Sequence, residues 1–197
     1  MDMNQIKKYL QENLSKQRCL HTFGVADEAV RLAKRYGADE DSAYIAGLLH
    51  DCAKEIPADE ALHILRNEFR IEPNAMMLKE PRLLHGTLGA CIAQSVFDIY
   101  DTDILDAIKY HTTGKANMCL LGKIIYIADY IEPNRTYHGV EELRKLAYRD
   151  LDAAIIFGID FTITDLIKRG MVIQPDTLHC RNYLLMQREG VEQEPKI

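Results

Sequence analysis

The sequence predicts an all-α fold in which a single bundle of helices forms one domain. Apolar residues recur at helical spacing along most of the chain, and no two segments alternate apolar and polar residues as paired strands would. We find no repeat, linker or low-complexity stretch that would divide the 197 residues, of which 47% are hydrophobic and 27% charged, into separate units. We therefore expect one domain over residues 1–189, followed by a polar C-terminal tail over residues 190–197.

Helical periodicity begins near the amino end of the chain. Residues 4–14 carry apolar side chains at helical spacing and predict a short amphipathic helix. A longer helix is predicted over residues 17–36, with Gly37 as its stop because glycine readily adopts the left-handed conformation that ends many helices. His21 falls on the apolar stripe of this second helix and is therefore expected to face the core.

An almost entirely apolar helix follows. Asp39 or Asp41 would cap its beginning, it is expected to continue to near Lys54, and Pro57 then breaks the pattern. Because nearly every face of residues 43–49 is apolar, this helix must be buried on most of its circumference.

Weaker patterns occupy the middle of the chain. A helix is expected around residues 61–69, and helical periodicity resumes over residues 83–93. Between Pro73 and Pro81 the pattern fades, which predicts a short helix or a loop that covers a pocket.

The second half of the chain predicts five more helices. Ile124, Ile125 and Ile127 would also suit a strand, but no partner strand is predicted, so we interpret their segment as a helix. The five helices are expected over residues 103–111, 118–132, 140–147 and 150–168, and from Pro175 to the polar tail.

Charge, hydropathy and cysteine usage exclude several classes of protein. A formal net charge of −6 leaves no basic stripe for a nucleic-acid backbone, so DNA or RNA is not an expected partner. No run approaches the ~18 consecutive apolar residues of a membrane span, and the start lacks the order of a secretory signal, so we expect a cytoplasmic protein without a membrane partner. The five cysteines show no CxxC spacing, which predicts reduced, mostly buried thiols.

The predicted functional site centres on His50 and Asp51, which the apolar helix delivers into the interior. A carboxylate moved out of water without a partner is strongly destabilising, so a cation is expected against Asp51. His21 and Asp129 also lie in apolar segments where each needs a partner. Two imidazoles and two carboxylates form a donor set that suits iron, manganese, cobalt or zinc. The plain alternative is a helical scaffold whose buried histidines and aspartates are only hydrogen-bonded to one another.

Two further imidazoles lie in similar settings. His85 and His111 each adjoin a glycine or a threonine that leaves room for a ligand, and they could hold a second metal ion or contact a phosphate. The other three histidines, His63, His138 and His179, have no such setting, and we leave them out of the site.

In combination, these residues resemble a known family. His21, the His50-Asp51 pair and Asp129, in this order along an all-helical chain, resemble the HD-domain metal-dependent phosphohydrolases, which are named for that pair. The pair alone is a weak signal, whereas five motifs in order are specific, and they are similar to the YqeK branch of the family over nearly the whole chain. The five motifs are His21–Val25, Gly47–Lys54, His85-Gly86, His111–Gly114 and Tyr126–Arg135.

The resemblance implies a symmetrical bis(5'-nucleosyl)-tetraphosphatase, which cuts diadenosine tetraphosphate at its centre and releases two ADP molecules. It implies bound iron as the cofactor, with manganese, cobalt or zinc as alternatives. The implied metal ligands are His21, His50, Asp51 and Asp129. A small-molecule nucleotide is the expected partner, and a homodimer is an option that the sequence leaves open.

The remaining candidates are assigned to the reaction. Asp129 or Asp51 would take the proton from the attacking water, and His85 and His111 would contact phosphate or act as a general acid. Lys54, three residues beyond Asp51, would reach a phosphate. The catalytic candidates are His85, His111, Lys54 and Asp129.

Substrate binding involves two more positions. Arg135, just past the helix break at Pro133, offers a planar fork to a phosphate, and apolar contacts are expected around the base at Ile56, Met76, Met77 and Pro175. The substrate-binding candidates are His21, Lys54, His85, His111, Asp129, Arg135 and Pro175.

Two other functions stay open. A phosphohydrolase acting on a nucleoside monophosphate, a cyclic nucleotide or a stringent-response nucleotide would share the metal site and differ only in its pocket. A non-catalytic nucleotide sensor would hold a structural metal, but a purely structural ion needs none of His85, His111 and Lys54 beside it.

Overall fold

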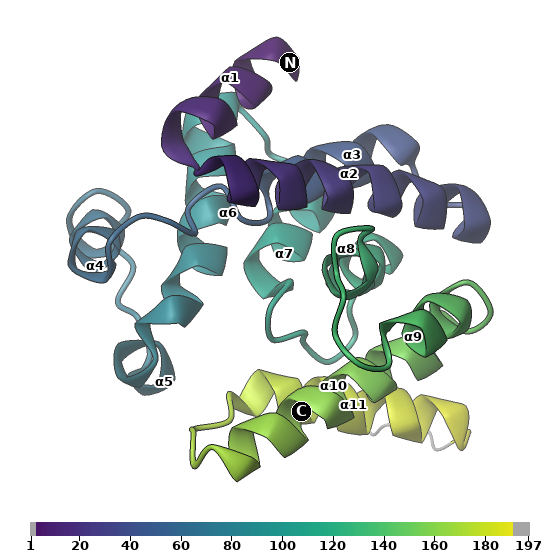
Figure 1. The fold of residues 1–197 in the computed structure, drawn as a ribbon. Coiled ribbons are helices and arrows are strands. Elements are labelled where there is room, and N and C mark those ends of the chain that lie inside the picture. Colours follow the sequence, from purple (N-terminus) through teal and green to yellow (C-terminus); the bar gives the residue numbers. More distant parts are fainter. Residues whose placement is uncertain (1–2, 191–197) are drawn as a thin grey trace.

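The computed structural model describes residues 3–190, and within that range the chain is helical throughout, with short connections and no strand. The all-α prediction is confirmed. Eleven α-helices and one short 3-10 helix pack as a bundle, with α1 to α3 on one side and the pair α10 and α11 forming a layer on the other (Figure 1). Of the predicted polar tail, only Gly190 belongs to the described residues.

The first two helices follow the predicted pattern. Helix α1 spans Met3–Asn13 and buries Ile6 and Leu10, and α2 spans Lys16–Tyr36. Ser15 caps α2 by accepting a hydrogen bond from the amide of Arg18, and Gly37 ends it in the left-handed conformation at φ 75°.

Helix α3 is shorter than predicted. It spans Glu40–Leu49 and is capped by Asp39, whose side chain accepts from the amide of Ser42. The expected continuation to Lys54 is wrong, because after Leu49 the amides bond to carbonyls only three residues back, in tight turns. Two carboxylate oxygens of Glu55 accept from the amide and the hydroxyl of Ser15 at 2.5 and 2.7 Å, which ties this turn to the start of α2.

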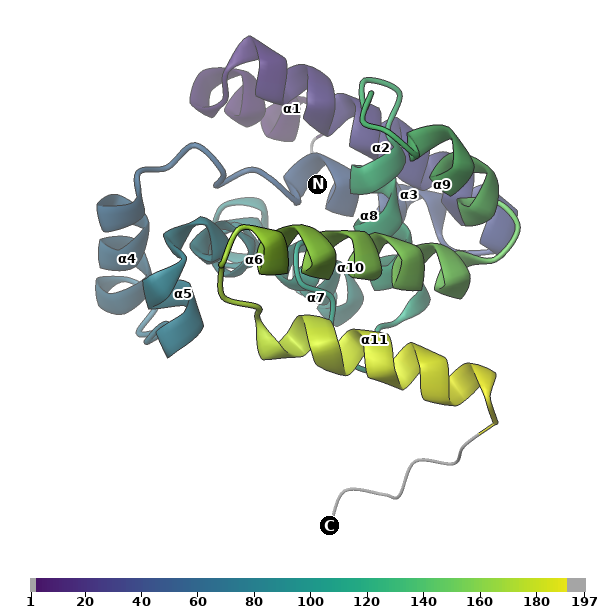
Figure 2. The same cartoon turned by 60° about the horizontal axis from the view of Figure 1, so that its bottom comes forward.

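The middle of the chain forms a side lobe. Helix α4 spans Ala58–Asn67, α5 spans Ala75–Lys79, the 3-10 helix spans Pro81–Leu83, and α6 spans Leu84–Phe97. The weak pattern between the two prolines is therefore a short helix, and α5 has no buried residue. Helices α4 and α5 lie together at the edge of the bundle (Figure 2).

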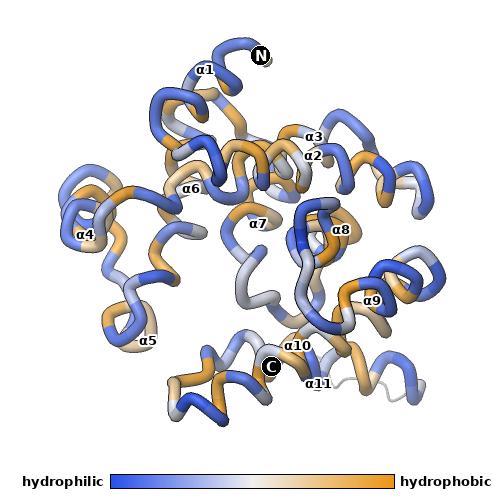
Figure 3. Tube along the Cα trace, in the orientation of Figure 1, coloured by the Kyte–Doolittle hydropathy of each residue, from blue (hydrophilic) through white to orange (hydrophobic). Residues whose placement is uncertain are grey.

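Helix α8 (Leu120–Ile131) forms the centre of the core. It packs against α2, α7 (Thr102–Tyr110) and α10 (Leu151–Lys168), and its residues from Ile124 to Ala128 are fully buried, so the strand alternative is excluded. Figure 3 shows hydrophobic colour along α8 and mixed colours on the outer helix α4. Helices α9 (Val140–Ala147) and α11 (Pro175–Arg188) complete the bundle against α10.

Two glycines let helices approach closely beside the predicted site. A Cβ on Gly47 would lie 2.6 Å from the Cα of Ala26, so α3 lies directly on the backbone of α2. A Cβ on Gly86 would lie 2.5 Å from the carbonyl oxygen of Lys109, which brings α6 equally close to α7. These contacts lie next to the histidines of all four helices, and the side chains at both crossings can therefore meet.

The structure also bears on the predictions made for the cysteines and for membrane spans. The five cysteines are free, and three of them are buried. Within residues 3–190, no helix combines the length and the apolar character that a bilayer crossing requires.

Candidate metal centre and its pockets

The four predicted metal ligands meet at one place in the bundle. His21 comes from the second turn of α2, His50 and Asp51 from the end of α3, and Asp129 from the last turn of α8. One donor atom each of His21, His50 and Asp129 lie within 4.8 Å of one another. His50, Asp51 and His111 form a second such group, so His50 belongs to both. We call His21, His50, Asp51, His85, His111 and Asp129 the donor cluster.

Three imidazoles of the donor cluster are oriented by the same local contact. In each, Nδ1 faces the backbone carbonyl of the residue three positions earlier, and since a carbonyl only accepts, Nδ1 must carry the proton. The contact measures 2.6 Å from His50 to Gly47 and 2.7 Å from His111 to Ile108, and His85 makes it to Arg82. Each Nε2 therefore presents a lone pair towards the other donors, the orientation that metal ligation requires.

His21 is held by a carboxylate instead. Its Nδ1 donates to Oε1 of Glu132 at 3.1 Å, and its Nε2 lies 3.1 Å from Oδ1 of Asp129. Glu132 is itself buried and accepts from the backbone and side-chain amides of Asn134. A chain of bonds from the loop after α8 thus fixes the ring of His21.

Unsatisfied polar atoms converge on the donor cluster. Among the described residues, six buried side-chain polar atoms lack a hydrogen-bond partner, and three of them are Nε2 of His21, Nε2 of His50 and Oδ1 of Asp51. Buried polar groups normally have partners, and leaving one unpaired costs about 1–3 kcal/mol. Nε2 of His21 and Nε2 of His50 lie 3.8 and 3.6 Å from Oδ2 of Asp51. Imidazole lone pairs and carboxylate oxygens without hydrogens to share are the donors that a divalent transition metal satisfies.

The charge states of these side chains also suit a cation. Burial alone would raise the pKa of Asp51, but the nearby histidines outweigh it and hold the pKa well below its usual value. The pKa of Asp129 is also lowered, because the neighbouring His21 and His50 and the guanidinium of Arg135 outweigh the effect of burial. Both carboxylates are therefore ionised at neutral pH.

Two histidines are kept neutral. Burial lowers the pKa of His50 to about 3 and that of His85 to about 4, although Asp51 acts in the opposite direction on both. Their Nε2 lone pairs are therefore free of protons at neutral pH and available to a metal ion.

The predicted second pair of imidazoles lies against the other oxygen of Asp51. Nε2 of His85 and Nε2 of His111 are 3.0 Å apart and lie 3.3 and 3.4 Å from Oδ1 of Asp51. Nζ of Lys54 lies 3.0 Å from Nε2 of His85, and the hydroxyl of Thr112 is in reach of both rings. Lys54 therefore joins the site although its segment is a turn rather than a helix.

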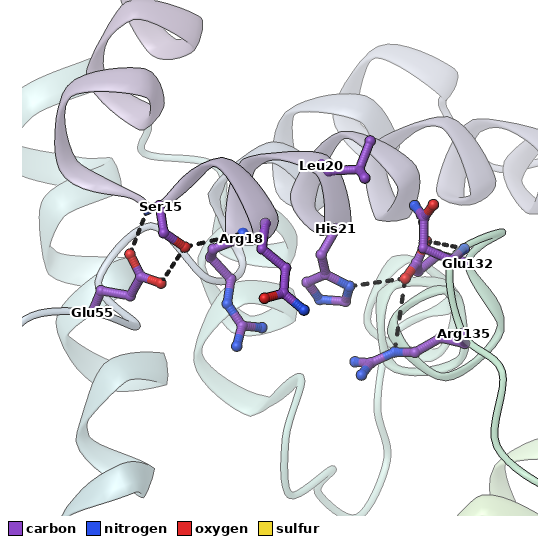
Figure 4. A pocket seen from close by; sticks show the side chains of 9 residues that line it. Ser15, Arg18, Leu20, His21, Glu55, Glu132 and Arg135 are labelled. Atoms are coloured by element: carbon purple, nitrogen blue, oxygen red, sulfur yellow. Dashed lines mark hydrogen bonds and ion pairs between the residues drawn. The ribbon is translucent and has the colours of Figure 1, made fainter.

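Two guanidinium groups border the cluster. Arg18 donates to Oδ2 of Asp51 at 2.9 Å, and Arg135 pairs with Asp129. In Figure 4 the side chains of Arg18 and His21 project from α2, and Arg135 lies below Glu132. Sequence reasoning missed Arg18, Glu132 and Thr112. Each had a signal, since Arg18 lies one turn before His21, Glu132 ends the apolar segment of Asp129, and Thr112 follows His111.

Three cavities adjoin the donor cluster. The α2 pocket, of about 320 Å³, is lined by Arg18, His21 and Arg135. The aliphatic pocket, also about 320 Å³, lies at the Lys54 and His85 side. The aromatic pocket, of about 370 Å³, contains Asp129 and Thr112. Volumes of this size suit small-molecule ligands.

The base contacts predicted from the sequence are only partly placed at these cavities. Ile56 lines the aliphatic pocket, whereas Met76, Met77 and Pro175 line none of the three. Pro175 is exposed at the first turn of α11. The histidines left out of the site, His63, His138 and His179, are all exposed.

Comparisons with known proteins agree with this geometry. Residues 18–134, a range that contains the whole donor cluster, match the sequence model of the HD domain. A Bacillus subtilis (strain 168) protein named bis(5'-nucleosyl)-tetraphosphatase, symmetrical, is 43% identical over 89% of this chain and 94% of its own length. A Halalkalibacterium halodurans protein of the same name is 40% identical over 96% of this chain and 100% of its own length.

A solved structure shares the fold. The crystal structure of a predicted HD superfamily hydrolase involved in NAD metabolism from Clostridium acetobutylicum superposes with a TM-score of 0.92 at 45% identity, over 95% of this chain and 98% of that one.

Proposed function

The chain belongs to the HD domain family, and on this premise we propose that it is a metal-dependent hydrolase that cleaves diadenosine tetraphosphate symmetrically into two ADP molecules. The observation that carries the proposal is the convergence of unpaired, proton-free donors beside three cavities. The substrate comes from the relatives, which cover nearly the whole chain and are named for this reaction.

His21, His50, Asp51 and Asp129 are the proposed metal ligands, with iron as the proposed metal and manganese, cobalt and zinc as alternatives. A transition metal bound there supplies a Lewis acid that lowers the pKa of water and polarises a phosphoryl oxygen. Glu132 acts through His21 by fixing the ring and its tautomer.

Cationic side chains around the cluster bind the polyphosphate. Arg18 and Arg135 line the α2 pocket and Lys54 lines the aliphatic pocket, so the three cations can neutralise phosphates on both sides of the scissile bond. In an in-line displacement at an inner phosphorus, charge builds up on the departing ADP, and a positioned ammonium or guanidinium stabilises it. Asp51 or Asp129, both ionised, takes the proton of the attacking water.

His85 has a narrower role than the sequence allowed. Its Nδ1 proton is committed to the carbonyl of Arg82, and its lowered pKa, about 4, leaves Nε2 without a proton at neutral pH. A neutral nitrogen of this kind accepts a hydrogen bond or a metal ion and cannot protonate a leaving group. Of the roles predicted for His85, the geometry therefore favours that of a metal ligand. Lys54 then donates the hydrogen bond to phosphate on that side of the donor cluster.

The decisive experiment supplies the metal-loaded protein with diadenosine tetraphosphate and separates the products by chromatography. ADP as the sole product is expected. AMP with ATP would contradict symmetrical cleavage, and turnover of a nucleoside monophosphate, a cyclic nucleotide or a stringent-response nucleotide in place of diadenosine tetraphosphate would replace the proposed substrate.

The number of metal ions is decided by His111→Ala, with the exposed His63→Ala as the matched control. If His111 is part of a second metal site, the variant loses about half of the metal measured by elemental analysis. If His111 contacts phosphate only, the metal content stays unchanged and KM rises.

Location and assembly stay predictions from the sequence. We propose a cytoplasmic enzyme that acts on a small nucleotide, with no nucleic-acid partner. A homodimer is the assembly to test, by light scattering of the purified protein.

A further inference from the structure

We propose that the aromatic pocket binds one purine base of the substrate by stacking it on Phe161, so that the two identical halves of the dinucleotide are held by two different subsites. This inference rests on the proposed function and adds to it a substrate-binding residue.

The aromatic pocket opens onto the donor cluster. Its inner lining contains Asp129, a proposed metal ligand, and Thr112, whose hydroxyl lies 3.2 Å from Nε2 of His85 and 3.0 Å from Nε2 of His111. Its outer lining comes from α10 and includes Phe161. A nucleotide with its phosphates at the donor cluster can therefore place its base against α10 (Figure 2).

The aromatic walls are held in place by polar contacts. The Tyr137 hydroxyl donates to the carbonyl of Tyr130 at 3.0 Å, and the Tyr130 hydroxyl bonds to Thr162 at 2.7 Å. The ring of Tyr130 in turn stacks on the buried Tyr126, with centroids 5.3 Å apart. These bonds fix the ring of Tyr137, so the pocket has a preformed face.

Phe161 extends that face towards solvent. Its ring lies 5.7 Å from that of Tyr137 at an interplanar angle of 29°, and the residue is 49% exposed. A flat, half-exposed aromatic surface at the mouth of a cavity is what a nucleobase stacks on, because every base offers a π face of similar size.

Charge orients a nucleotide in this pocket. Arg135 lies at the inner end beside Asp129, whereas the only charged side chain that lines the α10 wall is Asp165. Phosphate is therefore attracted inwards, since Asp165 pairs with Arg169 through Oδ2 at 3.0 Å and offers phosphate no donor. The carboxylate of Asp165 can accept a hydrogen bond from a base amine or a ribose hydroxyl, the donors that a nucleoside carries.

The other side of the donor cluster is different. The aliphatic pocket combines Ile56, Ala61 and Leu84 with the cations Lys54 and Arg82. A symmetrical substrate that spans the donor cluster thus meets an aromatic pocket at one end and an aliphatic pocket at the other. The structure assigns the stacking interaction to one base only.

The test compares Phe161→Ala with Phe157→Ala. Both phenylalanines lie on α10, one turn apart, and are 49% and 43% exposed, but only Phe161 lines the pocket. We expect Phe161→Ala to raise the KM for diadenosine tetraphosphate by about tenfold, the range found for loss of one base stack, with little change in kcat. Phe157→Ala should match the unchanged protein. Equal KM values in all three proteins would overturn the inference while leaving the proposed function intact.

A binding measurement gives the same answer without turnover. The chain contains no tryptophan, so Phe161→Trp and Phe157→Trp each introduce a single fluorescent indole. ADP should quench the indole of Phe161→Trp, because the base stacks on it, and leave that of Phe157→Trp unchanged. Phe161→Trp should also keep a normal KM, whereas Phe161→Leu should not, since leucine is apolar but has no π face. Failure of ADP to quench Phe161→Trp would refute the subsite even if the protein has another substrate.

Discussion

Two buried polar residues of α2, two turns apart on the same face, have opposite surroundings. Glu28 is 5% exposed and accepts hydrogen bonds from the Tyr148 hydroxyl at 2.7 Å and from Arg31 at 3.0 Å. His21 is 8% exposed and bonds to Glu132 through Nδ1, but its Nε2 has no hydrogen-bond partner. Burial of a polar side chain therefore does not by itself identify a functional site. A buried donor atom that its neighbours orient but leave without a hydrogen-bond partner is the feature that identifies a candidate site.

The difference lies in the unpaired donor atoms and not in the charges. Around Glu28 the negative charge is balanced within the protein by Arg31. Around His21 the carboxylates Asp51 and Asp129 are also each paired with a guanidinium, from Arg18 and Arg135, but Nε2 of His21 and Nε2 of His50 have no hydrogen-bond partner. The network around Glu28 is complete and stabilises the fold, whereas the donor cluster keeps capacity for a cation.

The largest effect is expected for a substitution in the donor cluster, which should remove activity, unlike one in the network around Glu28. Oδ2 of Asp51 lies near the Nε2 atoms of His21 and His50, and Oδ1 lies near those of His85 and His111. Asp51→Ala should therefore abolish stoichiometric metal binding and lower kcat by about a thousandfold or more. Elemental analysis and ADP release measure it. Full metal content and turnover in this variant would show that the donor cluster is not the active site.

A smaller loss of metal affinity is expected when a residue that contacts a proposed metal ligand is changed. Glu132→Gln keeps the shape of the side chain but removes the charge that orients His21, so metal affinity should fall by about 10- to 100-fold. A competition titration with a chelator measures it. Glu141→Gln, an exposed glutamate paired with Arg144, is the matched control and should bind metal normally.

The opposite outcome is expected at Glu28. Glu28→Ala leaves the half-buried Tyr148 hydroxyl without its acceptor, so the free energy of unfolding should fall by about 1–3 kcal/mol in urea denaturation. Metal content and activity per folded molecule should not change. The exposed neighbour Asp27 supplies the control, since Asp27→Ala should leave stability unaltered, and loss of metal from Glu28→Ala would contradict the distinction between the two networks.

The gentlest test is the pH dependence of the metal-free protein. The pKa of His50 is lowered from 6.5 to about 3, so between these values the unfolded chain binds a proton that the folded protein does not, and stability should decline as the pH falls below 6.5. The pKa of Tyr148 is raised above its usual 10.0 by burial and by Glu28, so stability there is complete below pH 10 and declines at higher pH. Thermal melts from pH 5 to 11 measure the decline in stability at both the acidic and the alkaline end. His50→Gln should make the decline at acidic pH shallower, with His85 supplying part of what remains, and should leave the decline at alkaline pH unchanged.

Much of the fold could be predicted from the sequence because helix caps and apolar stripes are local features. The Asp39 cap and the Gly37 stop lie within a few residues of the backbone groups that they satisfy, and the apolar stripe of α2 follows from residue spacing alone. The end of α3 was not readable. It depends on Glu55, which binds Ser15 forty residues earlier in the chain.

The sequence by itself determined which side chains gather at the candidate site, because ionisable residues in apolar segments need partners wherever those segments pack. Only the tertiary structure decided how they meet. The distance from His21 to Asp129 depends on how α2 crosses α8, and the proximity of His50 depends on the close approach at Gly47, which no local pattern encodes. Helix formation is governed by neighbours in sequence, whereas the geometry of a site is governed by packing between segments that are far apart in the chain.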